Sequence, residues 1–145
     1  MKYLIILLFL VFTSCSKSFF QSQIGNEIKN GYEINIDTSK LKLEWNKLIF
    51  ANNIDGKVTN FEIKSDTDHG TGKKYYYLFS KSKNNELKMA TKLLKKNKKF
   101  YIDNQELRFV ICHGCNDSYP RIYNNSWSCE TDNLFECKKT EVVKF

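Results

Sequence analysis

The sequence predicts an α+β domain: one N-terminal amphipathic helix packed on an antiparallel β-meander, with a disulfide-tied C-terminal loop and strand. Three observations predict this class. One stretch, residues 39–51, carries apolar residues at helical spacing. Several later stretches alternate apolar and polar residues, and residues 112–145 carry four cysteines. A pattern of one helix followed by a run of strands favours a helix that covers one face of an antiparallel sheet.

The chain begins with a segment typical of an export signal. Lys2 precedes an unbroken apolar run, residues 3–12, and two small residues then lead into Cys15. A positive start, an apolar stretch of about 7–15 residues and small residues at the cleavage site describe a secretory signal peptide. The apolar run is shorter than the about 20 residues that cross a bilayer. We therefore expect a lipoprotein-type signal peptide over residues 1–14.

The residues around Cys15 are similar to a bacterial lipobox. Phe12-Thr13-Ser14-Cys15 gives a larger apolar residue, two small residues and a cysteine, although Phe12 departs from the usual aliphatic residue. The resemblance implies that Cys15 is acylated, and several acyl chains such as palmitate make membrane anchoring effectively permanent. Ser16 stands where an aspartate would suggest inner-membrane retention, which favours the outer membrane. The alternative is a secreted or periplasmic protein.

The composition limits the partners of the exported part. Residues 15–30 are polar and lack a sustained period, so we expect a lipidated tether there and a single α+β domain over residues 31–145. The chain carries 23 basic and 16 acidic residues, of which Arg108 and Arg121 are the only arginines. Because arginine is preferred for bidentate phosphate and base recognition, nucleic-acid binding is disfavoured. A positive surface still favours anionic lipid head groups, acidic glycans or an acidic protein partner.

Residues 39–51 are the predicted helix. Asp37 and the two hydroxyl residues after it are candidate N-caps. The apolar residues recur at i, i+4, i+7 and i+8: Leu41, Trp45, Leu48 and Ile49. Leu41, Leu43 and Trp45 also alternate, so a strand is the alternative for this stretch.

After Gly56 the period changes to two, which predicts strands. They lie near residues 58–65, 75–79, 87–93, 100–102 and 107–111, with a weaker first strand over residues 32–36. We expect one face of the sheet to carry Tyr75, Tyr77 and Phe79. The opposite face is expected to carry Tyr76, Leu78 and Val110. Both faces therefore need a cover.

Residues 112–145 form a cysteine-rich tail that we expect to act as a lid and to end in a strand near residues 140–145. With Cys15 acylated, the remaining cysteines are an even set in an oxidising compartment, which predicts two structural disulfides. They are Cys112, Cys115, Cys129 and Cys137. Of three possible pairings we favour Cys112 with Cys137, as a link between neighbouring strands, and Cys115 with Cys129.

A metal- or thiol-redox-active protein that uses Cys112 and Cys115 is the alternative. Their spacing to the other two cysteines, C-x2-C-x13-C-x7-C, lacks the second tight pair of a zinc ribbon. The pair also follows a predicted antiparallel strand, whereas a redox pair would need a helix N-terminus. The chain as a whole resembles small uncharacterised bacterial lipoproteins with a cysteine-rich C-terminal segment. This resemblance implies an envelope location, and it brings no assigned activity.

No catalytic residue, metal site or cofactor is predicted. His69 and His113 are the only histidines, and neither lies in a nucleophile motif. Asp66-x-Asp68-x-Gly70 resembles the opening of a calcium loop, but its fifth position is glycine, so a hairpin turn is the better interpretation.

The tail instead supplies candidate binding residues. They are an arginine and three aromatic residues: Tyr119, Arg121, Tyr123 and Trp127. Rigid aromatic side chains with an arginine nearby suit a sugar or a protein partner. We therefore expect an interaction module rather than an enzyme, for example an inhibitor or immunity factor that faces a protein or glycan.

Overall fold

A computed structural model describes residues 23–103, 107–131 and 137–144. Within these ranges 54% of residues are in strands and 12% in the one helix. In chain order the elements are β1 (Gln23–Ile28), β2 (Gly31–Ile34), α1 (Thr38–Ala51), β3 (Asn60–Thr67), β4 (Lys74–Lys81), β5 (Leu87–Lys96), β6 (Lys99–Ile102), β7 (Arg108–His113), β8 (Tyr119–Tyr123), β9 (Ser126–Glu130) and β10 (Lys138–Val143).

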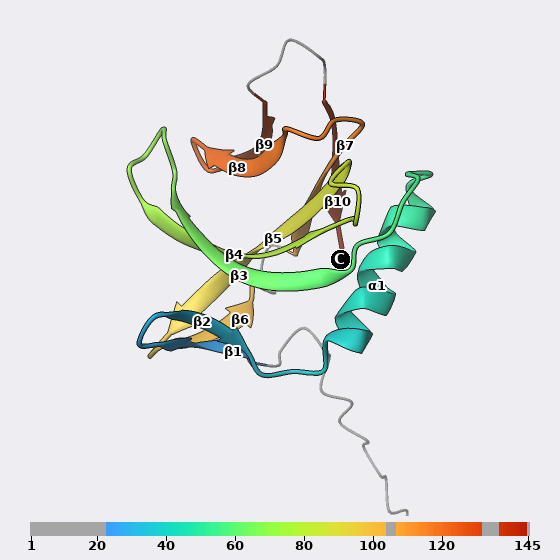
Figure 1. Cartoon of the computed structure of the whole chain (residues 1–145). Helices are drawn as coiled ribbons and strands as arrows, with labels where there is room; N and C mark the ends of the chain where they lie inside the picture. The colour runs from blue at the N-terminus through green and yellow to red at the C-terminus, as the bar shows by residue number, and fades with distance from the viewer. Residues whose placement is uncertain (1–22, 104–106, 132–136, 145) are drawn as a thin grey trace, which may run out of the picture.

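Eight of the strands form one antiparallel sheet in the order β10-β7-β5-β6-β1-β2, and β3 and β4 join it at the other side of β5. The long strand β5 joins the strands of this sheet. One edge of β5 pairs with β4, and the other edge pairs with β7 along its first half and with β6 along its end. The sheet curves until β2 reaches β3, where the Tyr32 hydroxyl bonds to the Ser65 hydroxyl at 3.0 Å. The result is a nearly closed, barrel-like sheet (Figure 1).

The predicted α+β class is therefore wrong: the chain is mostly β, and its sheet nearly closes instead of lying as an open meander under a helix. Closure depends on β1, which lies inside the stretch assigned to a tether and pairs with both β2 and β6. Gly25 permits this arrangement. A Cβ at Gly25 would collide with the carbonyl oxygen of Glu33 in β2 and the side chain of Ile63 in β3.

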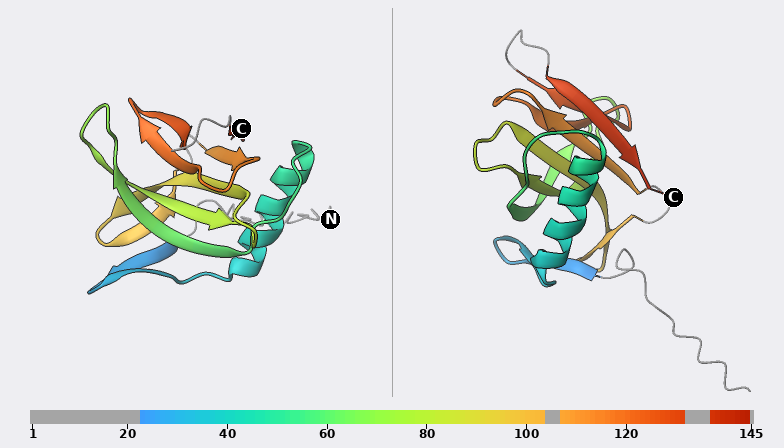
Figure 2. Two further views of the ribbon diagram at one scale, coloured as in Figure 1. Left: turned by 45° about the horizontal axis from the view of Figure 1, so that its top comes forward. Right: turned by 90° about the vertical axis from the view of Figure 1, so that its right-hand side faces the viewer.

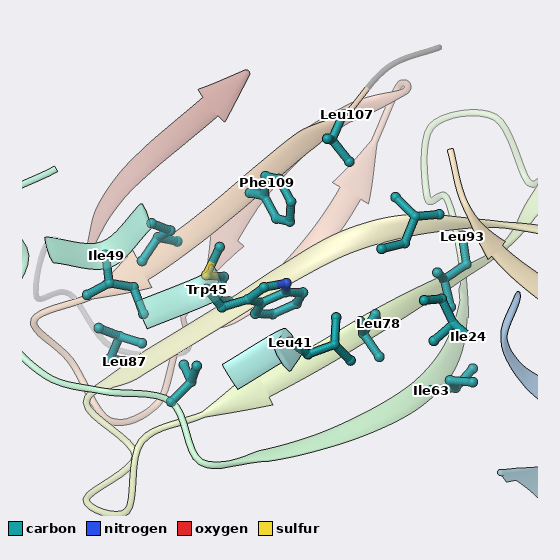
Figure 3. Packing of buried hydrophobic residues seen from close by; sticks show 14 of the residues in the cluster. Ile24, Leu41, Trp45, Ile49, Ile63, Leu78, Leu87, Leu93, Leu107 and Phe109 are labelled. Atoms are coloured by element: carbon teal, nitrogen blue, oxygen red, sulfur yellow. The ribbon is translucent and has the colours of Figure 1, made fainter. Parts of the chain in front are cut away.

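The predicted helix is confirmed as α1, and the strand alternative for this stretch is excluded. The carboxylate of Asp37 accepts a hydrogen bond from the backbone N–H of Ser39 at 2.9 Å, which caps the first turn. Three residues of its apolar stripe are buried: Leu41, Trp45 and Ile49. Figure 3 shows these side chains against residues of the sheet, with Trp45 close to Phe109. The helix thus covers the inner face of the curved sheet.

The central strands β4, β5 and β7 are buried on both faces. The main core lies between their inner face and α1 and includes Leu78, Met89, Phe109 and Ile111. A second cluster lies on the outer face, under the β8–β9 hairpin: Tyr75, Tyr77, Phe79, Ala90, Val110, Cys112, Ile122 and Trp127. Val110 therefore shares a face with Tyr75, not with Tyr76 and Leu78 as expected.

The cysteine-rich tail covers the outer face as predicted, but it does so as a two-stranded sheet instead of a loop. Figure 2 shows this hairpin beside the larger sheet. At its tip, Asn124 and Asn125 have positive φ angles of 48° and 63°. Asparagine tolerates this left-handed conformation better than most residues, and two such residues in a row suit a tight turn between antiparallel strands.

Two disulfides are present, as predicted, but the favoured pairing is wrong. Cys112 is bonded to Cys129, and Cys115 to Cys137. The register of β10 on β7 explains the difference, because it places Lys139 opposite Cys112. Cys137 therefore lies beyond the end of β7, within reach of Cys115. The two disulfides fit an extracytoplasmic location.

Candidate functional site

A groove of about 280 Å³ opens where the start of β4 and the end of β5 meet the tip of the β8–β9 hairpin. Four lysines and two tyrosines dominate its lining: Lys73, Lys74, Lys92, Lys95, Tyr75 and Tyr76. We call it the lysine groove. Strand pairing brings its walls together, since Tyr76 lies opposite Leu93 and Tyr77 opposite Lys92.

Asp68 fixes the hairpin tip over the groove. One of its carboxylate oxygens accepts hydrogen bonds from the backbone N–H groups of Gly70 (2.8 Å), Thr71 (3.2 Å) and Asn124 (2.9 Å). The other accepts one from Asn125 at 2.8 Å. Burial raises the pKa of Asp68, but these N–H groups outweigh it and lower the pKa to about 2. The side chain therefore stays ionised and joins the β3–β4 turn to the hairpin.

These bonds also decide between the two interpretations of the Asp66–Gly70 segment. It forms a hairpin turn, in which Asp68 bonds to backbone N–H groups and Asp66 lies 3.7 Å from the guanidinium of Arg121. Among residues 23–103, 107–131 and 137–144, no group of three or more histidine, cysteine, aspartate or glutamate side chains is placed to hold a metal ion.

Two lysines of the groove lie beside Tyr76. The ammonium groups of Lys74 and Lys95 lie 5.4 and 5.0 Å from the centre of its ring. Lys95 also forms an ion pair with Glu27 at 2.8 Å, and this hydrogen bond raises the pKa of Lys95. Lys95 is therefore a permanent cation at one wall of the groove.

Three of the four predicted binding residues lie together on the surface. Tyr119, Arg121 and Tyr123 alternate along the outward side of β8, with Tyr119 50% and Tyr123 57% exposed. Arg121 is half-exposed and forms an ion pair with Glu130 across the hairpin. The ring of Tyr119 also lies 4.9 Å from the ammonium group of Lys88.

Trp127, the fourth, is a core residue instead. It is opposite Ile122 in the hairpin register, which turns both side chains inward. Only 5% of Trp127 is exposed, and its ring meets those of Tyr75 and Tyr77 edge-on, at 6.2 and 6.1 Å between centroids. It therefore holds the hairpin on the sheet and is not available to a ligand.

Buried Lys88 supports the loop between β7 and β8. Its ammonium group donates hydrogen bonds to the backbone oxygens of Asn85 (2.7 Å) and Asn116 (2.5 Å). Burial lowers the pKa of Lys88, while the charge of Asp117 opposes that change. Cys115 lies in the same loop. Because Cys112 and Cys115 are each bonded to a distant cysteine, the C-x2-C motif is not one redox pair.

Sequence reasoning missed the lysine groove, although part of its signal was visible. Lys73-Lys74-Tyr75-Tyr76 places two cations beside two aromatic residues, and Lys92 and Lys95 lie in the following strand. The signal peptide, Cys15 and the tether up to residue 22 lie outside the described residues.

Comparisons with protein-family models, curated proteins and solved structures found no match for this chain. Within the part of the chain that the structure describes, α1 is too short and too polar to cross a membrane, and it is the one helix there.

Proposed function

We propose that this chain is a membrane-anchored extracytoplasmic lipoprotein that acts by binding, and that the lysine groove is its ligand site. The observation that carries the proposal is the groove itself, which is lined by four lysines and two tyrosines among other residues. A cleft with a few converging polar groups is the usual form of a small-ligand site. The ligand is part of a protein or glycan partner, or a free molecule, that presents an acidic group.

The walls of the groove are held in place before any ligand arrives. Strands β4 and β5 are paired over six residue pairs, from Tyr76–Leu93 to Lys81–Lys88. The hairpin that closes the groove is fixed at its tip by Asp68 and near its base by the Cys112–Cys129 disulfide. A site built on fixed elements loses less conformational entropy on binding, which favours recognition.

The proposed lipid on Cys15 keeps the domain near the membrane. Seven residues, 16–22, separate Cys15 from Gln23, the first residue of β1, which makes eight steps along the chain (23 minus 15). At about 3.5 Å per residue an extended chain of this length spans about 28 Å. The proposal therefore places the binding domain directly above the lipid head groups, with the outer membrane as the expected site.

A ligand screen with a matched variant tests the binding site. Amide NMR spectra are recorded with acidic, neutral and basic sugars and short peptides. We expect acidic compounds to shift the amides of Tyr76 and Leu93, and the variant Lys74→Gln/Lys95→Gln to weaken this effect. The control Lys42→Gln/Lys57→Gln removes two exposed lysines outside the groove. If no compound shifts groove amides, the proposed site is wrong.

The anchor is tested separately by growing the producing cells with labelled palmitate. The native chain should carry the label in the outer-membrane fraction, and Cys15→Ala should abolish it. Absence of label on the native chain contradicts the anchoring part of the proposal and leaves the groove as a site of a secreted or periplasmic protein.

A further inference from the structure

We infer that the lysine groove binds a phosphate group carried by a small alcohol; this rests on the proposed function and names its ligand class. Two sources supply such a group near a membrane: a soluble phosphate ester and the head group of an anionic phospholipid. Both present tetrahedral phosphate oxygens, as a monoester in the first case and as a diester in the second. The inference concerns this shared phosphate group, and the experiment below separates the two sources.

The protein compensates only part of the positive charge of the lysine groove. Lys73, Lys74 and Lys92 take part in no ion pair with any residue of 23–103, 107–131 or 137–144. Two carboxylates offset part of this charge: Asp68 lines the groove and stays ionised, and Glu27 pairs with Lys95 at 2.8 Å. Because protein walls reduce solvent screening, an anion gains more here than at an open surface.

The charge of the groove favours a phosphate monoester over a carboxylate, because a phosphate monoester carries about −1.5 to −2 at pH 7. Arginine's planar fork matches both carboxylate and phosphate, and lysine binds phosphate as a compact point charge. The ammonium groups of the groove come from the β3–β4 turn, the start of β4 and the end of β5. A tetrahedral anion offers oxygens in several directions, so we expect it to contact more than one of these lysines. We expect a planar carboxylate to contact fewer of them.

The size of the groove calls for a group larger than phosphate alone. Its volume of about 280 Å³ corresponds to roughly nine water molecules at about 30 Å³ each. A phosphate with a few attached carbon atoms fits this space, and a large ligand would extend outside it. Tyr76 and Leu94, which are both partly exposed, supply apolar surface for the carbon chain beside the lysines.

The place of the groove in the fold brings lipid head groups within reach. Gln23, where β1 begins, pairs with Tyr101, and Tyr101 pairs with Leu94 in the groove wall. Neighbouring strands lie about 4.8 Å apart, so the first residue of β1 is about 10 Å from that wall. If Cys15 is acylated, the tether therefore enters the domain close to the groove.

The test uses the chain from Ser16 onward, which keeps every described strand and the helix, with its disulfides formed. Binding of glycerol 3-phosphate is measured by calorimetry and by shifts of the amides of Tyr76, Leu93 and Leu94. Glycerate, a carboxylate with the same number of carbon atoms, and uncharged glycerol are the comparison ligands. We expect glycerate to bind about tenfold more weakly than the phosphate ester, and glycerol not to bind.

The variants show whether binding is local. Lys74→Gln/Lys95→Gln should weaken glycerol 3-phosphate binding by about tenfold or more, because two charge-assisted contacts are lost. Lys42→Gln/Lys57→Gln loses the same net charge from exposed positions and should stay within about twofold of wild type. Equal loss in both variants would show that only the overall charge attracts the anion, which overturns the inference.

Competition identifies the source of the phosphate. The competitor is dihexanoylphosphatidylglycerol, used below its micelle concentration. It displaces glycerol 3-phosphate if the groove accepts a lipid head group, and it fails to do so if the ligand is a soluble ester. Either result supports the inference. Equal binding of glycerate overturns it. If a neutral sugar or a peptide occupies the groove and phosphate does not, the phosphate assignment fails while the proposed function stands. If nothing binds in the groove, both fail.

Discussion

The two disulfides should differ in their contribution to stability, although their loops are similar. Cys112–Cys129 closes a sequence separation of 17 residues and Cys115–Cys137 one of 22. The entropy that either bond removes from the unfolded chain is worth about 3 kcal/mol at 25 °C, so loop length does not distinguish them. Any clear difference between them must come from the folded state.

The folded state does distinguish the two bonds. Cys112 is fully buried in the outer cluster with Trp127, while both Cys115 and Cys137 are only half-buried. Replacing Cys112 and Cys129 by alanine removes sulfur atoms from a packed cluster, and each methyl-sized void costs about 1 kcal/mol. We expect the free energy of unfolding to fall by about 4–5 kcal/mol for Cys112→Ala/Cys129→Ala and by about 3 kcal/mol for Cys115→Ala/Cys137→Ala.

The assay is urea unfolding followed by tryptophan fluorescence. Trp45 lies in the main core and Trp127 in the outer cluster, so single-tryptophan versions made with Trp45→Phe or Trp127→Phe report on the two clusters separately. In Cys112→Ala/Cys129→Ala we expect Trp127 to respond at lower urea than Trp45. An equal loss for both disulfides, with coincident transitions, would refute the view that Cys112–Cys129 holds the hairpin on the sheet.

Three further substitutions test single contacts. Asp68→Asn should lower the melting temperature above about pH 4, and this difference from wild type should shrink towards pH 2. The reason is that the pKa of Asp68 falls from 3.8 to about 2 on folding, so the carboxylate stabilises the fold only while it is ionised. Thermal melts over this pH range measure the difference, with the exposed Asp55→Asn as control. Trp45→Ala should cost about 3–5 kcal/mol in urea unfolding, against less than about 0.5 kcal/mol for Leu43→Ala, a residue 58% exposed. Gly70→Ala should speed hydrogen exchange at the hairpin tip, because a Cβ there would collide with Asn124.

Local pattern predicted the elements better than their assembly. Leu41, Trp45 and Ile49 predicted the helix, because the apolar residues that recur at helical spacing are the same residues that the helix buries. The strands after Gly56 were found for the same reason. β1 was missed because its sequence, Gln23 to Ile28, has Gly25 at its centre and no apolar alternation. Since β1 joins β2 to β6, missing it changed the predicted class from a nearly closed sheet to an open one.

The candidate site depends even more on long-range contacts. Trp127 was predicted as a ligand-binding residue, and only its register opposite Ile122 shows that it faces inward. The lysine groove is formed by the β3–β4 turn, two paired strands and a hairpin that begins more than forty residues after Tyr75. In the sequence its lysines look like solubilising surface residues. That they line one groove is recognisable only when strand pairing brings β4 and β5 together.

The same contacts connect the groove to the compartment in which the chain folds. Ile122 and Asn125 of the hairpin line the groove, and the hairpin is fixed at its tip by Asp68 and near its base by Cys112–Cys129. In a reducing compartment this disulfide is absent. The hydrogen bonds of Asp68 at the tip and the packing of Trp127 are then left to hold the hairpin on the sheet. The groove should then be less well formed and bind more weakly. The test measures the affinity for glycerol 3-phosphate in Cys112→Ala/Cys129→Ala, with Cys115→Ala/Cys137→Ala as control. A loss of affinity in Cys112→Ala/Cys129→Ala alone supports the dependence of the groove on this disulfide. Unchanged affinity in both variants contradicts it.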